Sequence, residues 1–510
     1  MNDLPIIVAS IFMTFSCLLL WYKTRIKRMS LFKRLGIPGP EPNLITGNLL
    51  AFFRSSNVEY HSHLIEKFGP IVGYYLGSKP IIITKHLGLI NKIQHSRDFE
   101  DRPRLIPGGI NPSPKRCHML GNLPVHEWRE LRKILNKGFN TRQFKAMVPL
   151  VQQKIDKFID KLNENQSQEI DFYKFYQRLT LDIIGRTAFG VDTDVQYNKN
   201  DRFLLAVKQE FAKSANNYLV KLLLCFPEFS YIIQGFRKSI EYMKEKIGFT
   251  STSLLWTDCE TTLSMRKSFQ TSGDEVKDLL QIMIDMKLSD ECIIAQTVLF
   301  NEAAFETMSS SLGFITHFLL NNSDLTQELA TQVDEYMVNN DLDERIVDKL
   351  PLMDSVINET LRLYPPQTTF ISRSNPNNDL IFQDNGMYYM IPKGIQIQVA
   401  LYQIHRDDTN YPNAHRFNAR RFLNDSGNRI NMGTNGEFVD KWQPFGRGGR
   451  DCIGKTYARI VLKLILSNLL LKFNLNATRS TAKENELKVV FKTATMTPQT
   501  GIYGSVSAKP

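Results

Sequence analysis

The sequence predicts a mainly α-helical protein with a small β-sheet region and one apolar helix at its N-terminus. Three observations lead to this prediction. From about residue 120 onward, apolar residues recur at helical spacing in one segment after another. One of these segments, residues 291–320, has little charge in its middle and should run through the core. Strand-like alternation is confined to residues 71–84 and 388–402.

The N-terminal segment has the length and composition of a membrane span. Residues 4–22 carry no charge, and a helix of about 19 residues rises roughly 28 Å, close to the thickness of bilayer hydrocarbon. Trp21 and Tyr22 lie at its end, and basic residues follow at once, so the rest of the chain should face the cytosol. A cleaved secretory signal is the alternative, but no basic region precedes the run and no small-residue cleavage site follows it.

The chain should therefore divide into three parts. We expect a transmembrane anchor over residues 1–22, a basic and proline-rich linker over residues 23–47, and one large domain over residues 48–510. Length alone would suggest more domains, but no Gly/Ser-rich or Pro-rich linker interrupts residues 50–500.

Beyond the linker, helical periodicity predicts a series of helices. The expected segments are 125–139, 147–162, 170–189, 202–218, 274–286, 291–320, 324–338, 345–363 and 455–471. Tyr364, Pro365 and Pro366 should end the helix over 345–363. Residues 219–236 form an apolar patch that Pro227 and Glu228 interrupt, so it is either ordinary core or an exposed loop resting on a bilayer.

Charge and cysteine content restrict the class of partner. The net charge of +11 excludes a strongly acidic protein and suits an anionic membrane surface or an acidic protein partner. Nucleic acid is not expected, because no basic run is interleaved with aromatic residues. The six cysteines form no C-x-x-C pair, so they should be reduced thiols, and only Cys452 lies in a reactive setting.

Cys452 lies in a glycine-rich turn just before a predicted amphipathic helix. Residues 445–454 read Phe-Gly-Arg-Gly-Gly-Arg-Asp-Cys-Ile-Gly. The helix N-terminus and Arg450 should both lower the pKa of this thiol. The surrounding glycines allow backbone N–H groups and a flat cofactor to approach the sulfur closely. The pattern is typical of a thiolate that binds a metal.

This segment allows two further interpretations. Residues 449–456 match the phosphate-binding pattern G-x-x-x-x-G-K-[ST]. That pattern needs a buried strand directly before the loop, whereas residues 440–444 are polar and contain Pro444. The remaining interpretation is a buried structural cysteine in a loop.

Three further signals lie elsewhere in the chain. Glu359 and Arg362 are three residues apart on one helix face and can pair, although such pairs are common on surfaces. Glu306 and Thr307 lie within the long apolar helix, where an unpaired acid is costly; a hydroxyl bonded back to its own helix is the simpler interpretation of the threonine. A third helix carries Trp128 and Arg132, four residues apart. The arginine could hold an anionic group beside the tryptophan, or both residues could be ordinary surface.

Together these motifs resemble the cytochrome P-450 superfamily, the haem-thiolate monooxygenases, in its membrane-anchored eukaryotic microsomal form. The resemblance covers nearly the whole chain, and the four motifs occur in the order and spacing of that family. It implies the cytochrome P-450 fold, with haem between the long central helix and the helix after the cysteine loop. Residues 48–510 would then be the haem-thiolate catalytic domain.

The resemblance also implies roles for individual residues. Cys452 would be the axial ligand of the iron, Phe445 would pack beside it, and Gly446, Gly448 and Gly454 would shape the loop. Thr307 would position the water that delivers protons during oxygen activation, and Glu306 would supply those protons from solvent. The residues implied in holding the haem propionates are Trp128, Arg132, Arg373 and Arg450.

Two segments depart from the pattern of the family. Ala304 stands where a glycine is usual, and its methyl group could narrow the groove over the iron or tighten the local kink. Glu359 and Arg362 would form an ion-pair network below the haem with the arginine of a Pro-Glu-Arg-Phe segment. In this chain the segment reads Ala-Arg-Arg-Phe at 419–422, so Arg421 matches but the form of the local turn is open.

The implied reaction inserts one oxygen atom of O2 into a lipophilic substrate, such as a xenobiotic, a steroid or a fatty-acid-like molecule. The cofactor would be haem b, iron protoporphyrin IX. Electrons would come from NADPH through a flavoprotein reductase, with a cytochrome b-type protein as a further donor. The protein would be a single-pass protein of the endoplasmic reticulum membrane with its catalytic domain in the cytosol. Residues that could dock an acidic reductase, or simply form a solvated face, are Arg129, Lys133, Lys137, Lys441 and Arg447.

Three other functions compete with the monooxygenase, and the sequence also indicates which residues would line a substrate pocket. A haem-thiolate isomerase or dehydratase of lipid peroxides would use no reductase, and the intact pair of Glu306 and Thr307 argues against it. The chain could instead be a P-loop nucleotide hydrolase, or a haem-binding sensor without turnover. The expected pocket-lining residues are Phe300, Ala303, Ala304, Thr307, Thr369, Phe370 and Ile371.

Overall fold

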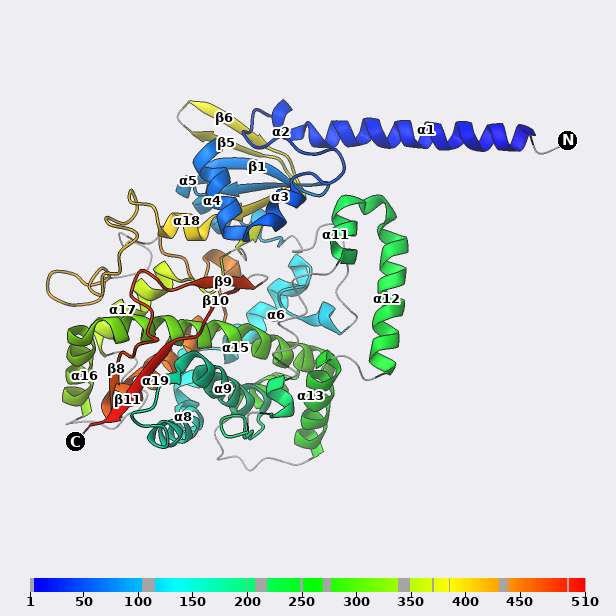
Figure 1. The fold of residues 1–510 in the computed structure, drawn as a ribbon. Coiled ribbons are helices and arrows are strands. Elements are labelled where there is room, and N and C mark those ends of the chain that lie inside the picture. Colours follow the sequence, from blue (N-terminus) through cyan, green and yellow to red (C-terminus); the bar gives the residue numbers. More distant parts are fainter. Residues whose placement is uncertain are drawn as a thin grey trace. The chain divides into compact units, whose positions relative to one another are not determined.

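The computed structural model describes residues 4–102, 115–198, 200–205, 207, 218–247, 251–268, 277–337, 349–368, 371–384, 386–430, 438, 440–492 and 495–509. The chain divides into two compact units. The first comprises Met1–Ile110, Asn217–Glu241 and Ile371–Ala400, and the second comprises Asn111–Asn216, Tyr242–Phe370 and Leu401–Pro510. Helices dominate and the sheets are small, which confirms the predicted fold class (Figure 1). The three-part division of the chain stays a prediction.

The first unit is built around a four-stranded sheet with the order β1-β2-β7-β4. Strands β1 and β2 form an antiparallel hairpin with Gly73 opposite Ile82, and β7 runs parallel to β2 with Ile397 opposite Ile82. A second hairpin pairs β5 with β6. The strands are β1 Ile71–Leu76, β2 Lys79–Thr84, β4 Ser372–Arg373, β5 Leu380–Asp384, β6 Met387–Ile391 and β7 Gln396–Val399. The helices are α1 Leu4–Met29, α2 Leu31–Arg34, α3 Leu49–Arg54, α4 Asn57–Phe68, α5 Leu87–His95, η1 Arg97–Phe99, α11 Tyr218–Cys225 and η4 Pro227–Phe229, and α12 Ser230–Lys246 continues into the second unit.

Helix α1 is the candidate membrane span. Within the described residues, Ile7–Met29 is the helix long and apolar enough to cross a bilayer, with a mean hydropathy of 1.5 and none of its most apolar window buried. Near its end, Arg25 is buried, and its guanidinium donates to the carbonyl oxygens of Leu44 at 3.0 Å and Ile45 at 2.9 Å. These bonds tie the last turns of α1 to the segment that follows it.

The apolar patch over residues 219–236 has a buried side and an exposed side. Leu223 and Leu224 of α11 are buried. Phe229 and Phe236 are more than half exposed, as is Ile232 between them. Part of the patch is therefore ordinary core, and part of it is exposed. Contact of the exposed part with a membrane stays a prediction.

The second unit is a helical assembly around α15 Asp290–Asn321. Figure 1 shows α15 running through this unit, and it packs against α9, α13, α17 and α19. The other helices are η2 Arg116–His118, α6 Val125–Gly138, α7 Thr141–Ala146, α8 Val148–Asn163, α9 Phe172–Ile184, the π-helix η3 Gly185–Phe189, α13 Ser251–Ser268, α14 Leu279–Asp285, α16 Ser323–Met337, α17 Pro351–Leu363, α18 Leu401–His405, η6 Gly448–Arg450 and α19 Lys455–Lys472. Two small sheets pair β3 Ile170–Asp171 and β8 Phe473–Asn476 with β11 Tyr503–Ala508, and β9 Val489–Lys492 with β10 Thr495–Pro498.

Helix α15 begins and ends for identifiable reasons. The side chain of Ser289 accepts a hydrogen bond from the amide of Cys292, and two acidic residues occupy the first turn, where the helix dipole favours negative charge. With 32 residues the helix is roughly 48 Å long. Every residue from Met308 to Leu320 is buried, which confirms that the helix runs through the core.

Two expected segments differ from the structure, and a third cannot be compared with it. The helix expected over 345–363 begins at Pro351, because proline suits the first turn of a helix. The strand expected over 388–402 is divided by a turn at Gly394, which has a φ of 77°, and α18 begins at Leu401. The helix expected over 202–218 lies largely outside the described residues.

Candidate functional site

Glycines and a backbone hydrogen bond shape the loop that carries Cys452. Gly446 and Gly448 have φ values of 68° and 71°, in the left-handed region where a side chain is strained. Helix η6 follows, and the amide of Cys452 then donates to the carbonyl oxygen of Phe445 at 2.8 Å. The cysteine is thereby held two residues before Gly454, the N-cap of α19.

Cys452 keeps accessible surface, although its thiol is surrounded by protein. The residue is exposed by its accessible surface, yet burial raises the pKa of its thiol. The backbone N–H of Gly454 donates to the sulfur, and the nearby cations Arg132 and Lys455 also act to lower the pKa. The residue therefore keeps accessible surface, while protein packs closely enough around the thiol to disfavour its charged form.

The expected direction of this pKa shift is wrong. Burial outweighs the groups that favour the thiolate, of which the Gly454 amide is the largest. Arg450, the cation expected to act on the thiol, contacts an aromatic side chain. Its guanidinium instead lies over the ring of Trp128, 3.7 Å from the ring centroid, and both side chains are buried. A coordinated metal ion deprotonates a thiol outright, so the raised pKa does not oppose metal binding.

Arg132 is bound to the cysteine loop itself. Its Nη2 lies 2.7 Å from Oδ1 of Asp451, and its Nη1 donates to the Asp451 carbonyl oxygen at 3.0 Å. Asp451 also pairs with Lys455 at 2.6 Å. Asp451 was not among the residues predicted for the site, although its place beside the cysteine was visible in the sequence. The Nε of Arg132 is buried without a hydrogen-bond partner among the described residues, which leaves it available to an anionic group.

Arg373 belongs to the first unit and is described within it. It ends the two-residue strand β4, is 2 % exposed, and donates through Nη1 to the carbonyl oxygen of Ser372 at 2.9 Å. Ile371 of the same unit is also buried. The two other expected pocket residues of this segment, Thr369 and Phe370, lie outside the described residues.

The middle of α15 keeps accessible surface at four residues that lie on one face of the helix. Ala303 is exposed, and Phe300, Ala304 and Thr307 are half-buried, whereas the helix beyond Thr307 is buried on every side. The hydroxyl of Thr307 donates to the carbonyl oxygen of Ala303 at 2.7 Å. This back-bond is the simpler interpretation of the threonine, and it leaves the oxygen lone pairs as acceptors.

Glu306 points away from that face. The residue is 4 % exposed, and its Oε1 accepts a hydrogen bond of 2.6 Å from the hydroxyl of Tyr173 on α9. Burial, followed by the negative charge of Glu306, raises the pKa of Tyr173, so the phenol remains the donor. Tyr173 lies 133 residues from its partner, and no signal in the sequence connected them.

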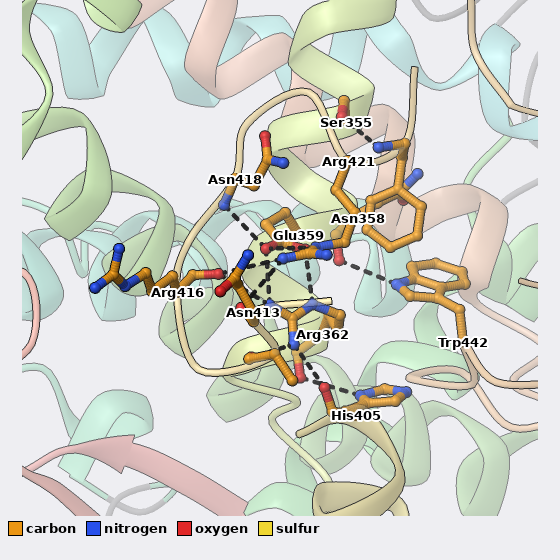
Figure 2. A network of polar contacts seen from close by, with 12 residues as sticks. Ser355, Asn358, Glu359, Arg362, His405, Asn413, Arg416, Asn418, Arg421 and Trp442 are labelled. Atoms are coloured by element: carbon orange, nitrogen blue, oxygen red, sulfur yellow. Dashed lines mark hydrogen bonds and ion pairs between the residues drawn. The ribbon is translucent and has the colours of Figure 1, made fainter. Parts of the chain in front are cut away.

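Glu359 and Arg362 form the centre of a buried polar network (Figure 2). Both side chains are fully buried, and two parallel hydrogen bonds of 2.7 Å join them. The Nε of Arg421 donates to the Glu359 carboxylate at 3.1 Å, and the backbone amide of Asn418 donates to the same carboxylate at 3.0 Å. The arginine of the altered segment therefore reaches Glu359, while Arg420 turns outward to other partners.

His405 connects this network to the polypeptide that leads to the cysteine loop. Arg362 donates to the carbonyl oxygen of His405 at 2.6 Å, and His405 Nδ1 lies 3.1 Å from the carbonyl oxygen of Arg362. The amide of Gln443 donates to His405 Nε2 at 3.1 Å. Figure 2 shows the ring beside Arg362. Neither His405 nor Gln443 was predicted from the sequence.

The residues before the loop do not suit a P-loop. Each residue from Asp440 to Arg447 lies in a turn or irregular backbone, where a phosphate-binding loop would follow a buried strand. Lys455, the lysine of that pattern, pairs with Asp451. The geometry thus offers a cysteine with accessible surface, and the partly buried guanidinium of Arg132 bound to the neighbouring Asp451, which fits an anionic, metal-carrying macrocycle.

Comparison with known proteins agrees with this geometry. A family model described as cytochrome P450 matches residues 37–503. The chain is similar to cytochrome P450 3A14 of Cavia porcellus, with 28 % identity over 475 residues that cover 90 % of this chain and 89 % of that protein. It is also similar to thromboxane-A synthase of Rattus norvegicus, with 26 % identity over 537 residues, 96 % of this chain and 95 % of that protein.

A third relative is cytochrome P450 3A6 of Oryctolagus cuniculus, with 26 % identity over 468 residues that cover 88 % of each chain. The relatives are of the eukaryotic microsomal type, and the family consists of haem-thiolate monooxygenases, a class of oxidoreductases. Because the family model spans well over half of the sequence, the chain belongs to the cytochrome P450 family.

Proposed function

We propose that this protein is a monooxygenase that inserts one oxygen atom of O2 into a lipophilic organic substrate, with electrons supplied from NADPH by a flavoprotein reductase. The observation that carries the proposal is Cys452, an exposed cysteine whose loop is closed by the hydrogen bond from its own amide to the carbonyl oxygen of Phe445. Membership of the cytochrome P450 family supports the same reaction class.

Cys452 would hold haem b as the axial ligand, with Phe445 and Gly454 beside the sulfur. Arg132 would meet a propionate group, since its buried Nε lacks a hydrogen-bond partner in the described part of the chain. The other residues proposed for the propionates are Trp128, Arg373 and Arg450. When bound, the haem supplies an iron centre for oxygen activation, and a thiolate ligand favours cleavage of the O–O bond.

Thr307 and Glu306 are the proposed proton-handling residues. The Thr307 hydroxyl uses its proton on the carbonyl oxygen of Ala303, so it can accept a hydrogen bond from water. It can therefore orient that water on the accessible face of α15. Glu306, one residue earlier on the same helix, would supply protons to this water.

The remaining proposals concern partners and location. Helix α1 would anchor the protein once in the endoplasmic reticulum membrane, with the catalytic domain in the cytosol. Arg129, Lys133 and Lys137 are exposed on α6 at intervals of one turn and would attract an acidic reductase surface. Arg447 contributes less to this attraction because it is paired with Asp440 at 2.8 Å.

A second candidate function comes from the relatives called thromboxane-A synthase. A haem-thiolate isomerase or dehydratase of lipid peroxides would need neither NADPH nor a reductase. The presence of Thr307 and Glu306 on α15 favours the monooxygenase, because a peroxide substrate brings its own activated oxygen and needs no proton delivery to O2.

Reconstitution separates these candidates. The purified protein is first screened for spectral shifts with steroids, fatty acids and drug-like lipophiles, and the substrates that bind are then incubated with reductase and NADPH. We expect an oxygenated product and substrate-dependent NADPH consumption. Product from a lipid hydroperoxide alone, with none from NADPH and reductase, would establish the isomerase or dehydratase. Binding without NADPH consumption in any combination would indicate a sensor.

A further inference from the structure

Two tyrosines of α9 contact α15 through their hydroxyl groups. The partner of one is a carboxylate, and the partner of the other is a hydroxyl group. Tyr173 donates to the Glu306 carboxylate at 2.6 Å. Tyr176, one turn further along, shares a hydrogen bond of 2.7 Å with the hydroxyl of Thr316. All four side chains are buried, but only the first pair includes an acid proposed to take part in the reaction.

The length of the bond between Tyr173 and Glu306 indicates a strong interaction. A hydroxyl donor and an ionised acceptor typically approach to about 2.5–2.7 Å, shorter and stronger than neutral pairs. The side chains of Gln177 and Ser310 also act to lower the pKa of the Tyr173 hydroxyl, against the larger effect of burial. Each lies one turn beyond its neighbour, Gln177 after Tyr173 on α9 and Ser310 after Glu306 on α15. The hydrogen bond that holds the phenol is therefore the one to Glu306, from α9 to α15.

The direction of this contact matters for the proposed chemistry. Consecutive residues of an α-helix are about 100° apart around its axis, so Glu306 and Thr307 cannot share one face. Thr307 lies on the face that keeps accessible surface, and Glu306 is turned toward α9. The position of the Glu306 carboxylate therefore depends on its contact with α9, which is the hydrogen bond from Tyr173.

We propose that Tyr173 is a positioning residue that fixes the carboxylate of Glu306 beside α9, and so sets the geometry from which Glu306 serves the Thr307 face. This proposal rests on the proposed function of Glu306 as the proton source. Tyr173 itself transfers no proton in it. Removing the hydroxyl frees the carboxylate to adopt other rotamers and leaves it without this donor.

The test uses three variants of the full-length holoprotein. Tyr173→Phe removes the hydroxyl and keeps the ring, and Tyr176→Phe is the matched control on the same pair of helices. Glu306→Gln keeps an acceptor for the Tyr173 hydroxyl and reports the role of the acid itself. Product formed per NADPH is measured for each, together with the infrared carboxyl bands, which the Glu306→Gln difference spectrum assigns to Glu306. The reduced carbon monoxide spectrum and the thermal unfolding midpoint show that each variant is folded.

We expect Tyr173→Phe to reduce product per NADPH several-fold, toward the value of Glu306→Gln, and to shift the Glu306 carboxyl bands, while Tyr176→Phe leaves both unchanged. The proposal is overturned if Tyr173→Phe forms as much product per NADPH as the wild type while Glu306→Gln forms less. It is equally overturned if both tyrosine variants lose coupling alike, because the effect is then a general loosening of the helices. Normal coupling in Glu306→Gln would remove the proposed role of the acid, and the positioning role with it.

Discussion

The amide of Cys452 donates a hydrogen bond of 2.8 Å to the carbonyl oxygen of Phe445, which closes the cysteine loop on itself. The sulfur is therefore positioned by backbone that precedes α19 as well as by the first turn of the helix. Substitutions that change only the sulfur should leave this loop intact, because its closing bond involves no side chain. This separation makes the proposed ligand testable independently of the fold.

Replacement of Cys452 by serine should remove the long-wavelength carbon monoxide band of thiolate-ligated haem, and with it monooxygenase activity. A hydroxyl keeps the size and hydrogen-bonding capacity of the side chain but is a far poorer ligand than a thiolate. The reduced carbon monoxide difference spectrum measures the effect. Cys292→Ser is the control, since this free cysteine is half-buried at the start of α15 and should leave the band unchanged. A normal band in Cys452→Ser would contradict the proposed ligand.

Replacement of Thr307 by alanine should retain haem but divert electrons from product. The variant loses the hydroxyl oxygen that can accept a hydrogen bond from water on the accessible face of α15. Product formed per NADPH should fall, while the carbon monoxide band and the unfolding midpoint stay close to the wild type. Thr331→Ala is a matched control because its hydroxyl makes the same back-bond, 3.0 Å to the carbonyl oxygen of Gln327, at an exposed position of α16. Unchanged coupling in Thr307→Ala would show that the hydroxyl is dispensable.

Replacement of Glu359 by glutamine should destabilise the second unit strongly. The change leaves Arg362 and Arg421 as buried cations without their carboxylate, and losing one partner of a buried ion pair costs about 3–5 kcal/mol. Urea or thermal unfolding of the holoprotein measures the loss. Arg420→Gln breaks a neighbouring pair with Glu328 whose side chains are 60 % and 38 % exposed, so it should cost no more than about 1 kcal/mol. Similar costs for both variants would contradict this account of the network.

His405 should make the protein less stable as the pH falls. Burial, followed by the charge of Arg362, lowers the pKa of His405 to about 3, and its Nε2 must stay unprotonated to accept the Gln443 amide. Below the ordinary value of 6.5 the unfolded chain therefore binds a proton that the folded chain excludes. The free energy of unfolding should decrease with falling pH between these two values, by about 1.4 kcal/mol for each pH unit.

His405→Gln isolates this contribution. The variant should be less stable than the wild type at neutral pH, because it loses the two ring contacts, but its stability should fall less steeply toward pH 5. Urea unfolding at several pH values gives both slopes. Equal slopes in the two proteins would mean that His405 is not a source of the acid sensitivity. Other buried histidines, such as His61, have the same effect in both proteins and cancel in the comparison.

Expectations that depend on neighbouring residues were largely met. Helical periodicity located α6, α8, α15 and α19 to within a few residues of their ends. The run of uncharged residues located the candidate membrane helix. Glycine spacing indicated a tight loop at Cys452, and positive φ values occur there. The pairing of Glu359 with Arg362 followed from their spacing of three on one helix. Each of these features is encoded within a few turns of chain, so a local pattern is enough to predict it.

The directions of side chains and their long-range partners were decided by the tertiary structure. The sequence could not show that Arg450 lies on Trp128, or that Arg132 binds Asp451 across 319 residues. It could not connect Tyr173 with Glu306. The physical reason is that a buried charge or hydroxyl must find a partner, and packing determines which residue from elsewhere in the chain is near enough to provide one. The sequence by itself therefore determined the candidate membrane helix, the other helices and the cysteine loop, and only the folded chain decided which groups surround the thiol and hold the acid of α15.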